Sequence, residues 1–223
     1  MGAVIGQVLP LALGVAISPI PIIAAILMLL SPRARVTSVG FLLGWVAGII
    51  VAVTVFTLVS STVAPADPDA SNPVQGVVQL VLGVLLIVLA AGQWRKRPKE
   101  DEEPELPKWM KAIDGMGFAT ALGLAFLLSA INPKNLLLAA GAGVDIGSAD
   151  LAVGEVIVVI TVFTVIAAST VLVPVVGYLI ASAKLRGPLD ELKGWLEREN
   201  TVIMAVLLLF IGVSLIGKGI GSF

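Results

Sequence analysis

Residues 118–143 read FATALGLAFLLSAINPKNLLLAAGAG, and this stretch decides how the chain folds. It is apolar and long enough to cross a membrane, which takes roughly 20 helical residues. Asn132, Pro133, Lys134 and Asn135 interrupt it near its middle. A proline that removes a backbone donor and a lysine charge are both costly at bilayer depth. The interruption therefore predicts a broken helix beside a pathway or binding site, with a kink that only shapes packing as the alternative.

A second apolar stretch, Val4 to Leu30, is interrupted in the same way by Ser18, Pro19, Ile20 and Pro21. Aligning Pro19 with Pro133 places the two breaks at corresponding depths. Broken apolar segments at matching positions of two halves are typical of transporters built from internal repeats.

The composition indicates a membrane protein. Of the 223 residues, 58% are hydrophobic and 13% are charged, whereas soluble domains average about 25% charged residues. The net charge is −1 and the basic residues form no continuous stripe, so we expect no nucleic-acid partner. The chain has no Cys and no His, so we expect no metal site, no cofactor and no enzymatic activity.

Six apolar segments are long enough to span a bilayer, and the chain is predicted to be an all-α polytopic membrane protein. They are Val4 to Leu30, Val36 to Ser60, Val74 to Trp94, Phe118 to Gly143, Leu151 to Ala183 and Thr201 to Ile216. The N-terminus has no basic region before its apolar stretch, so the first segment is expected to be retained.

The basic residues set the expected orientation. With both termini outside, every cytoplasmic loop is basic: Arg33 and Arg35, then Arg95 to Lys111, then Lys184 to Arg198. The external loops then contain Asp145 and Asp150 but no Lys or Arg, apart from Lys218 in a C-terminal tail. The excess of positive charge inside predicts a multi-pass protein of the plasma membrane with external N- and C-termini.

This topology divides the chain into residues 1–94, a charged cytoplasmic linker at 95–115, and residues 116–223. The first and fourth spans cross in opposite directions, so the two three-helix units are expected to be inverted repeats.

The paired motifs, Pro-x-Pro in the first span and Asn-Pro-Lys in the fourth, resemble the signature of the LysE-type exporter superfamily. That resemblance implies six spans in two inverted halves. This chain has Ile20 between the prolines and Ile22 after them, where the superfamily has a small residue and commonly a polar one. These two residues argue against an amino-acid substrate.

Across most of its length, and especially from Gly6 to Gly48, the chain is similar to the actinobacterial glycolipid-addressing family. The similarity is clearest at Ile17 to Pro21, Leu30 to Arg35 and Phe41 to Trp45. It implies a role in moving sulfolipids or glycopeptidolipids to the cell surface.

Two further features have two readings each, and a third has one. Gly40, Gly44 and Gly48 share one helical face, which favours close packing inside the chain or a homodimer. Thr161 and Thr164 give the fifth span a polar strip, and their hydroxyls satisfy local carbonyls or contact a substrate. Leu189 to Leu196, with interleaved charges, predicts a short amphipathic helix at the cytoplasmic surface.

We therefore expect a secondary exporter of an anionic cell-envelope glycolipid or its precursor. Lys134 is expected to attract the anionic head group, or to couple transport to proton movement by losing its charge. The alternatives are a non-transporting scaffold for lipid synthesis or export machinery, and an amino-acid-type exporter. The predicted substrate-binding residues are Ser18, Pro19, Pro21, Asn132, Pro133, Lys134, Asn135, Thr161 and Thr164.

Overall fold

The computed structural model describes residues 1–62, 73–97, 110, 113 and 115–223, and its long elements are α-helices. Most of the expected linker at 95–115 therefore lies outside the described residues. No strand forms in the described part of the chain. The helices are α1 (Gly2–Ala16), α2 (Pro19–Leu30), α3 (Ala34–Ser61), α4 (Pro73–Arg95), α5 (Phe118–Ala130), α6 (Pro133–Gly147) and α7 (Val153–Ile220).

Both breaks predicted from the prolines are present. Helices α1 and α2 meet at an angle of 53°, and α5 and α6 meet at 60°. Proline disfavours a helical conformation in the residue before it but fits the first turn of a helix. Ser18 is accordingly extended before Pro19, and Asn132 leaves the helical region before Pro133. Each proline therefore ends one helix and begins the next.

Four helical segments can each span a membrane, and the number rises to six if each bent pair forms one span. The last two of the four lie in α7, which is continuous except at Ala181, where φ is −139° and ψ is 50°. The expected amphipathic helix at 189–196 is part of this long helix. Leu189 and Leu196 are buried in it, while Leu192 and Trp195 are exposed.

Two charged residues lie in helices and not in the expected loop and tail. Asp145 belongs to α6, which continues past the predicted end at Gly143 to Gly147. Lys218 belongs to α7, which continues past Ile216 to Ile220. The loop and tail placements were wrong, because both helices are longer than the predicted spans and the two side chains pair with each other.

Glycines bring α3 and α5 into close contact. A Cβ on Gly40 would lie 2.6 Å from the Phe118 carbonyl oxygen, and one on Gly48 would lie 2.9 Å from that of Phe126. Gly44 meets the backbone of Leu122 between them. The glycine face is therefore filled by α5 of the same chain, and a homodimer through Gly40, Gly44 and Gly48 would have to displace that helix.

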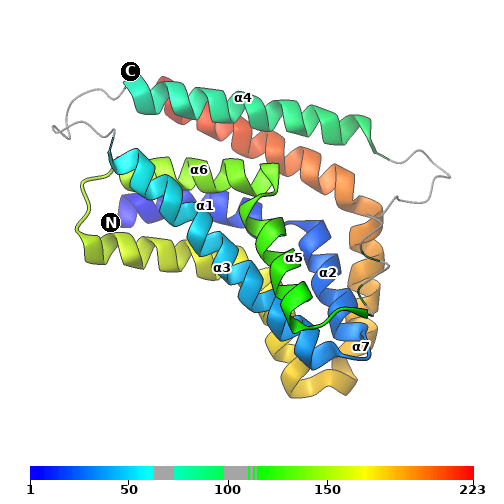
Figure 1. Cartoon of the computed structure of the whole chain (residues 1–223). Helices are drawn as coiled ribbons and strands as arrows, with labels where there is room; N and C mark the ends of the chain where they lie inside the picture. Colours follow the sequence, from blue (N-terminus) through cyan, green and yellow to red (C-terminus); the bar gives the residue numbers. More distant parts are fainter. Residues whose placement is uncertain (63–72, 98–109, 111–112, 114) are drawn as a thin grey trace.

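The packing of the remaining helices positions the breaks. Helix α3 also contacts α6, while α7 contacts α1, α2 and α4. Figure 1 shows the end of α6 that carries Asp145, and both chain termini, on the same side of the molecule. Phe41, Trp45 and Phe163 are among the largest fully buried side chains. Many apolar residues on the outer face are exposed, as is expected of a surface that contacts lipid.

Candidate functional site around the helix breaks

Lys134 reaches across from α6 to the end of α1. Its Nζ donates to the Gly14 carbonyl oxygen at 2.7 Å and to the Ser18 hydroxyl, and the residue is only 9% exposed. The last carbonyls of a helix have no partner within that helix, and this end of the helix dipole favours a cation. The break at Ser18 therefore creates the acceptors that hold the Lys134 ammonium group.

Thr170 of α7 satisfies another carbonyl at the same break. Its Oγ1 donates to the carbonyl oxygen of Ala16, the last residue of α1, at 2.6 Å. Thr170 was not among the predicted site residues. Nothing in the local sequence pairs it with Ala16, because the two are far apart along the chain.

The second break is satisfied in a similar way. Asn132 caps α6, because its side-chain oxygen accepts from the Lys134 backbone N–H at 3.1 Å. Asn135 donates through Nδ2 to the Leu128 carbonyl oxygen near the end of α5, at 2.9 Å. Its Oδ1 is buried and has no hydrogen-bond partner among the described residues. One acceptor beside Lys134 in the sequence therefore remains unused.

The other predicted site residues divide into two groups. Pro19 and Pro21 are buried, whereas Pro133 is exposed, and all three shape the breaks because they donate no hydrogen bond. Thr164 is buried with its hydroxyl unpartnered. Thr161 is exposed and donates to the Ile157 carbonyl oxygen of its own helix at 2.7 Å. Ser18 and Lys134 are in direct contact, while Thr161 contacts neither.

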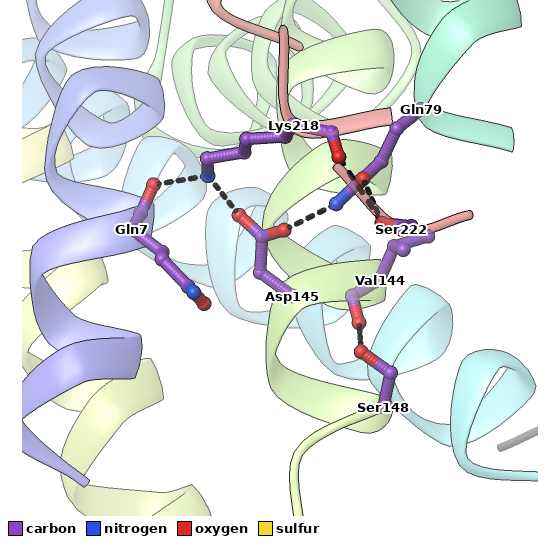
Figure 2. Close-up of polar contacts among 7 residues, drawn as sticks. All are labelled: Gln7, Gln79, Val144, Asp145, Ser148, Lys218 and Ser222. Carbon is purple, nitrogen blue, oxygen red and sulfur yellow. Dashed lines mark hydrogen bonds and ion pairs between the residues drawn. The ribbon is translucent and has the colours of Figure 1, made fainter. Parts of the chain in front are cut away.

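A second polar cluster, which the sequence did not predict, lies at the other end of α6 (Figure 2). Lys218 Nζ lies 2.7 Å from Asp145 Oδ2 and donates to the Gln7 carbonyl oxygen at 2.9 Å. Gln79 Nε2 donates to Asp145 Oδ1, also at 2.9 Å. The side chains of Asp145 and Lys218 are 1% and 24% exposed. This cluster joins α1, α4, α6 and α7.

One signal in the sequence could have revealed this cluster. Lys134 and Asp145 are separated by about three helical turns, so they point to nearly the same side of α6. Because the predicted span ended at Gly143, Asp145 was not placed on the same helix as Lys134.

The two clusters differ in charge. In the described part of the chain, no carboxylate lies within ion-pair distance of Lys134, whereas Asp145 neutralises Lys218. The Lys134 amine is thus buried and held by neutral groups. Such a site suits an anionic group, because a buried charge is stable only with adequate partners. Among the described residues, no group of three or more His, Cys, Asp or Glu side chains could hold a metal ion.

The sequence matches the family model described as "Sap, sulfolipid-1-addressing protein" over residues 8–221. The chain belongs to this family. It is therefore a multi-pass membrane protein of a family associated with lipid export or addressing. The match covers both helix breaks and every residue of the two polar clusters except Gln7. No curated protein and no solved structure matches the chain.

Proposed function

We propose that this protein is a secondary transporter that moves an anionic cell-envelope glycolipid, or its precursor, across the plasma membrane without catalysing a reaction. The observation that carries the proposal is the Lys134 ammonium group, which is buried at a helix break and has only neutral partners. A sulfate, phosphate or carboxylate head group would supply the missing negative charge. Family membership supports a lipid cargo.

The groups around Lys134 suit this cargo. The Ser18 hydroxyl already contacts Nζ and can donate to an anionic oxygen. Lys134 also lies in the first turn of α6, where the helix dipole favours negative charge. A head group could therefore replace the Gly14 carbonyl as the partner of Lys134 while keeping Ser18 and the start of α6 close by.

We further propose that the two halves, residues 1–94 and 116–223, are inverted repeats of the LysE-type superfamily. Two observations support this arrangement. Each half contains one bent helix pair with a proline at the start of its second helix. Each half also packs a long helix on the bent pair of the other half. Helix α3 packs on α5 and α6, while α7 packs on α1 and α2. The distribution of Lys and Arg supports external N- and C-termini.

A non-transporting scaffold is the second candidate, and one observation favours it. Lys134, Thr170 and Asn135 each satisfy a carbonyl at the end of a broken helix, and this can be their whole role. An amino-acid-type exporter is the third candidate. Ile22, which stands where that group commonly has a polar residue, is buried and apolar.

Reconstitution separates these candidates. The full-length protein would be placed in vesicles and offered a sulfated glycolipid, its unsulfated counterpart and a basic amino acid. We expect the sulfated lipid to change leaflet faster than in protein-free vesicles, and faster than its unsulfated counterpart. Movement of none of these would favour the scaffold, and movement of the amino acid alone would favour the third candidate.

A further inference from the structure

A groove of about 470 Å³ lies between α4 and the last part of α7. Its floor contains Ala90 and Ala205, which are each 4% exposed. Larger side chains form the walls of the groove, and every lining residue is apolar or aromatic. The lining residues are Ile87, Ala90, Ala91, Trp94, Ala205, Val206 and Leu209.

The groove arises from a change in side-chain size along the two helices. Near their other ends the helices touch through glycines, since a Cβ on Gly83 would lie 2.7 Å from the Gly212 carbonyl oxygen. A Cβ on Gly76 would likewise lie 2.9 Å from that of Gly219. Toward Trp94, the groove is lined by the methyl groups of Ala90, Ala91 and Ala205 between the larger side chains of Ile87, Trp94, Val206 and Leu209. Figure 1 shows this helix pair along one edge of the bundle.

One end of the groove is basic. Trp94 lines the groove and is followed directly by Arg95, Lys96 and Arg97, all of which are exposed. The guanidinium carbon of Arg97 lies 4.5 Å from the centre of the Trp94 ring, so this cation is held at the mouth of the groove. Tryptophan and arginine at the end of a span are typical of the level of the lipid head groups.

We propose that this groove holds one acyl chain of an anionic phospholipid from the surrounding leaflet. Its phosphate lies beside Arg95 and Arg97, and its chain follows α4 from Trp94 toward Ile87, a depth of about 10 Å. Basic residues at the membrane surface attract anionic lipids, and the apolar lining accepts only hydrocarbon. The site shares no residue with the Lys134 cluster, so it goes beyond the proposed transport function and does not require it.

Photocrosslinking of the full-length protein in vesicles tests this proposal. The probes are phosphatidylglycerol with a diazirine on one acyl chain and phosphatidylcholine with the same chain. The yield on peptides from 73–95 and 201–217 is measured by mass spectrometry. We expect a stronger yield with phosphatidylglycerol, by about fivefold for each basic residue that contacts the phosphate.

Two variants separate head-group recognition from chain binding. Arg95→Gln with Arg97→Gln should reduce the phosphatidylglycerol yield to that of phosphatidylcholine. Ala91→Phe should fill the groove and reduce the yield with both lipids several-fold. The matched controls are Arg33→Gln with Arg35→Gln, which are exposed and basic elsewhere, and Ala119→Phe on the exposed face of α5. Neither control should change the yield.

Three results would overturn the proposal. Equal yields from the two lipids in the unmodified protein would show only general contact with the bilayer. An undiminished yield in a folded Ala91→Phe protein would place the lipid elsewhere. Absence of crosslinks, together with disulfide formation between two Val206→Cys chains, would show that a second copy covers the groove. If Ala91→Phe fails to fold, the Arg95 and Arg97 variant still decides the question. If the protein proves not to transport lipid, these crosslinking yields should still be as expected, so the two proposals can fail separately.

Discussion

The two ends of α6 hold lysines in contrasting ways. Lys134 and Lys218 each donate to a carbonyl oxygen of α1, from Gly14 and Gln7 respectively. Lys218 is also paired with Asp145, and Gln79 satisfies the second carboxylate oxygen. Lys134 has only Ser18 and the backbone. About 16 Å of helix therefore separates an ion pair from a lysine that has no carboxylate partner among the described residues.

This difference indicates different roles. A buried ion pair with its other hydrogen bonds satisfied suits a fixed junction, because breaking either side exposes a charge to an apolar environment. A buried cation with neutral partners gains most from an anion that arrives and leaves. We therefore propose that the Asp145 end of α6 stabilises the junction and that the Lys134 end contacts substrate.

The largest expected effect is the loss of transport on replacing Lys134. Lys134→Met keeps much of the side-chain length and apolar packing but removes the ammonium group. We expect at least a tenfold fall in the rate of lipid movement in vesicles, with an unchanged size-exclusion profile. Lys134→Arg should restore only part of the rate, because its planar guanidinium group does not fit the same space.

Lys193→Met is a suitable control, because Lys193 forms only longer ion pairs, with Asp190 and Glu197, on α7. Normal transport by the Lys134→Met protein would remove Lys134 from the mechanism and favour the scaffold. Equal losses in both lysine variants would mean that the assay responds to charge in general.

The next largest effect is on stability at the other end of α6. Lys218→Met leaves the buried Asp145 carboxylate without its cation, which should cost about 3–5 kcal/mol of unfolding free energy. Asp145→Asn should cost less, because the remaining Lys218 side chain is 24% exposed and reaches water or head groups. Thermal unfolding in detergent measures both.

Replacing both partners sharpens this test. The double variant Lys218→Met with Asp145→Asn removes both charges, so it should recover most of the stability lost in Lys218→Met. A double variant as unstable as the sum of the two single variants would show that the charges do not act as a pair. Slower transport at full stability would mean that this end of α6 also contacts substrate.

Substitutions at two glycines that pack helices together also compare the two ends of α6, with an expected effect of intermediate size. Gly48 of α3 packs on Phe126 and Ser129 near the end of α5, whereas Gly147 of α6 packs on Thr57 and Ser60 of α3. Alanine at either position overpacks a backbone contact and should cost about 1–3 kcal/mol. Only Gly48→Ala should also slow transport, because it shifts the helix that leads into the Lys134 break.

Gly92→Ala on α4 is the control for this pair, because a Cβ there would have no neighbour within 4 Å. Equal transport losses for Gly48→Ala and Gly147→Ala would contradict the separation of roles. The measurements are vesicle transport at matched protein amounts and thermal unfolding.

The breaks were predictable and most of their contacts were not. Pro19 and Pro133 act locally, since proline restricts its predecessor and fits the first helical turn, so the sequence located both breaks. The partners of Lys134 come from α1, which depends on packing across the whole chain. Asp145 and Lys218 were assigned to an external loop and a tail because both lie beyond the ends of the predicted spans, and their pairing depends on packing across the whole chain. The run from Lys184 to Arg198 was expected to be a cytoplasmic loop, yet the helical segment Gly187–Ile220 begins within it and includes Pro188.

The smallest expected effect distinguishes two threonines of α7. Thr170→Val removes the hydroxyl that donates to the Ala16 carbonyl oxygen at the Lys134 break, which should cost about 0.5–1.5 kcal/mol. A modest slowing of transport should accompany it, because that carbonyl belongs to the helix end that holds Lys134. Thr161→Val should change neither property measurably, since this exposed hydroxyl only bonds to Ile157 of its own helix. Both substitutions replace threonine with valine, so any difference between their effects on stability and transport comes from their positions in the fold. Transport slowed more by Thr161→Val than by Thr170→Val would move the substrate path to the outer face of α7 and away from the break.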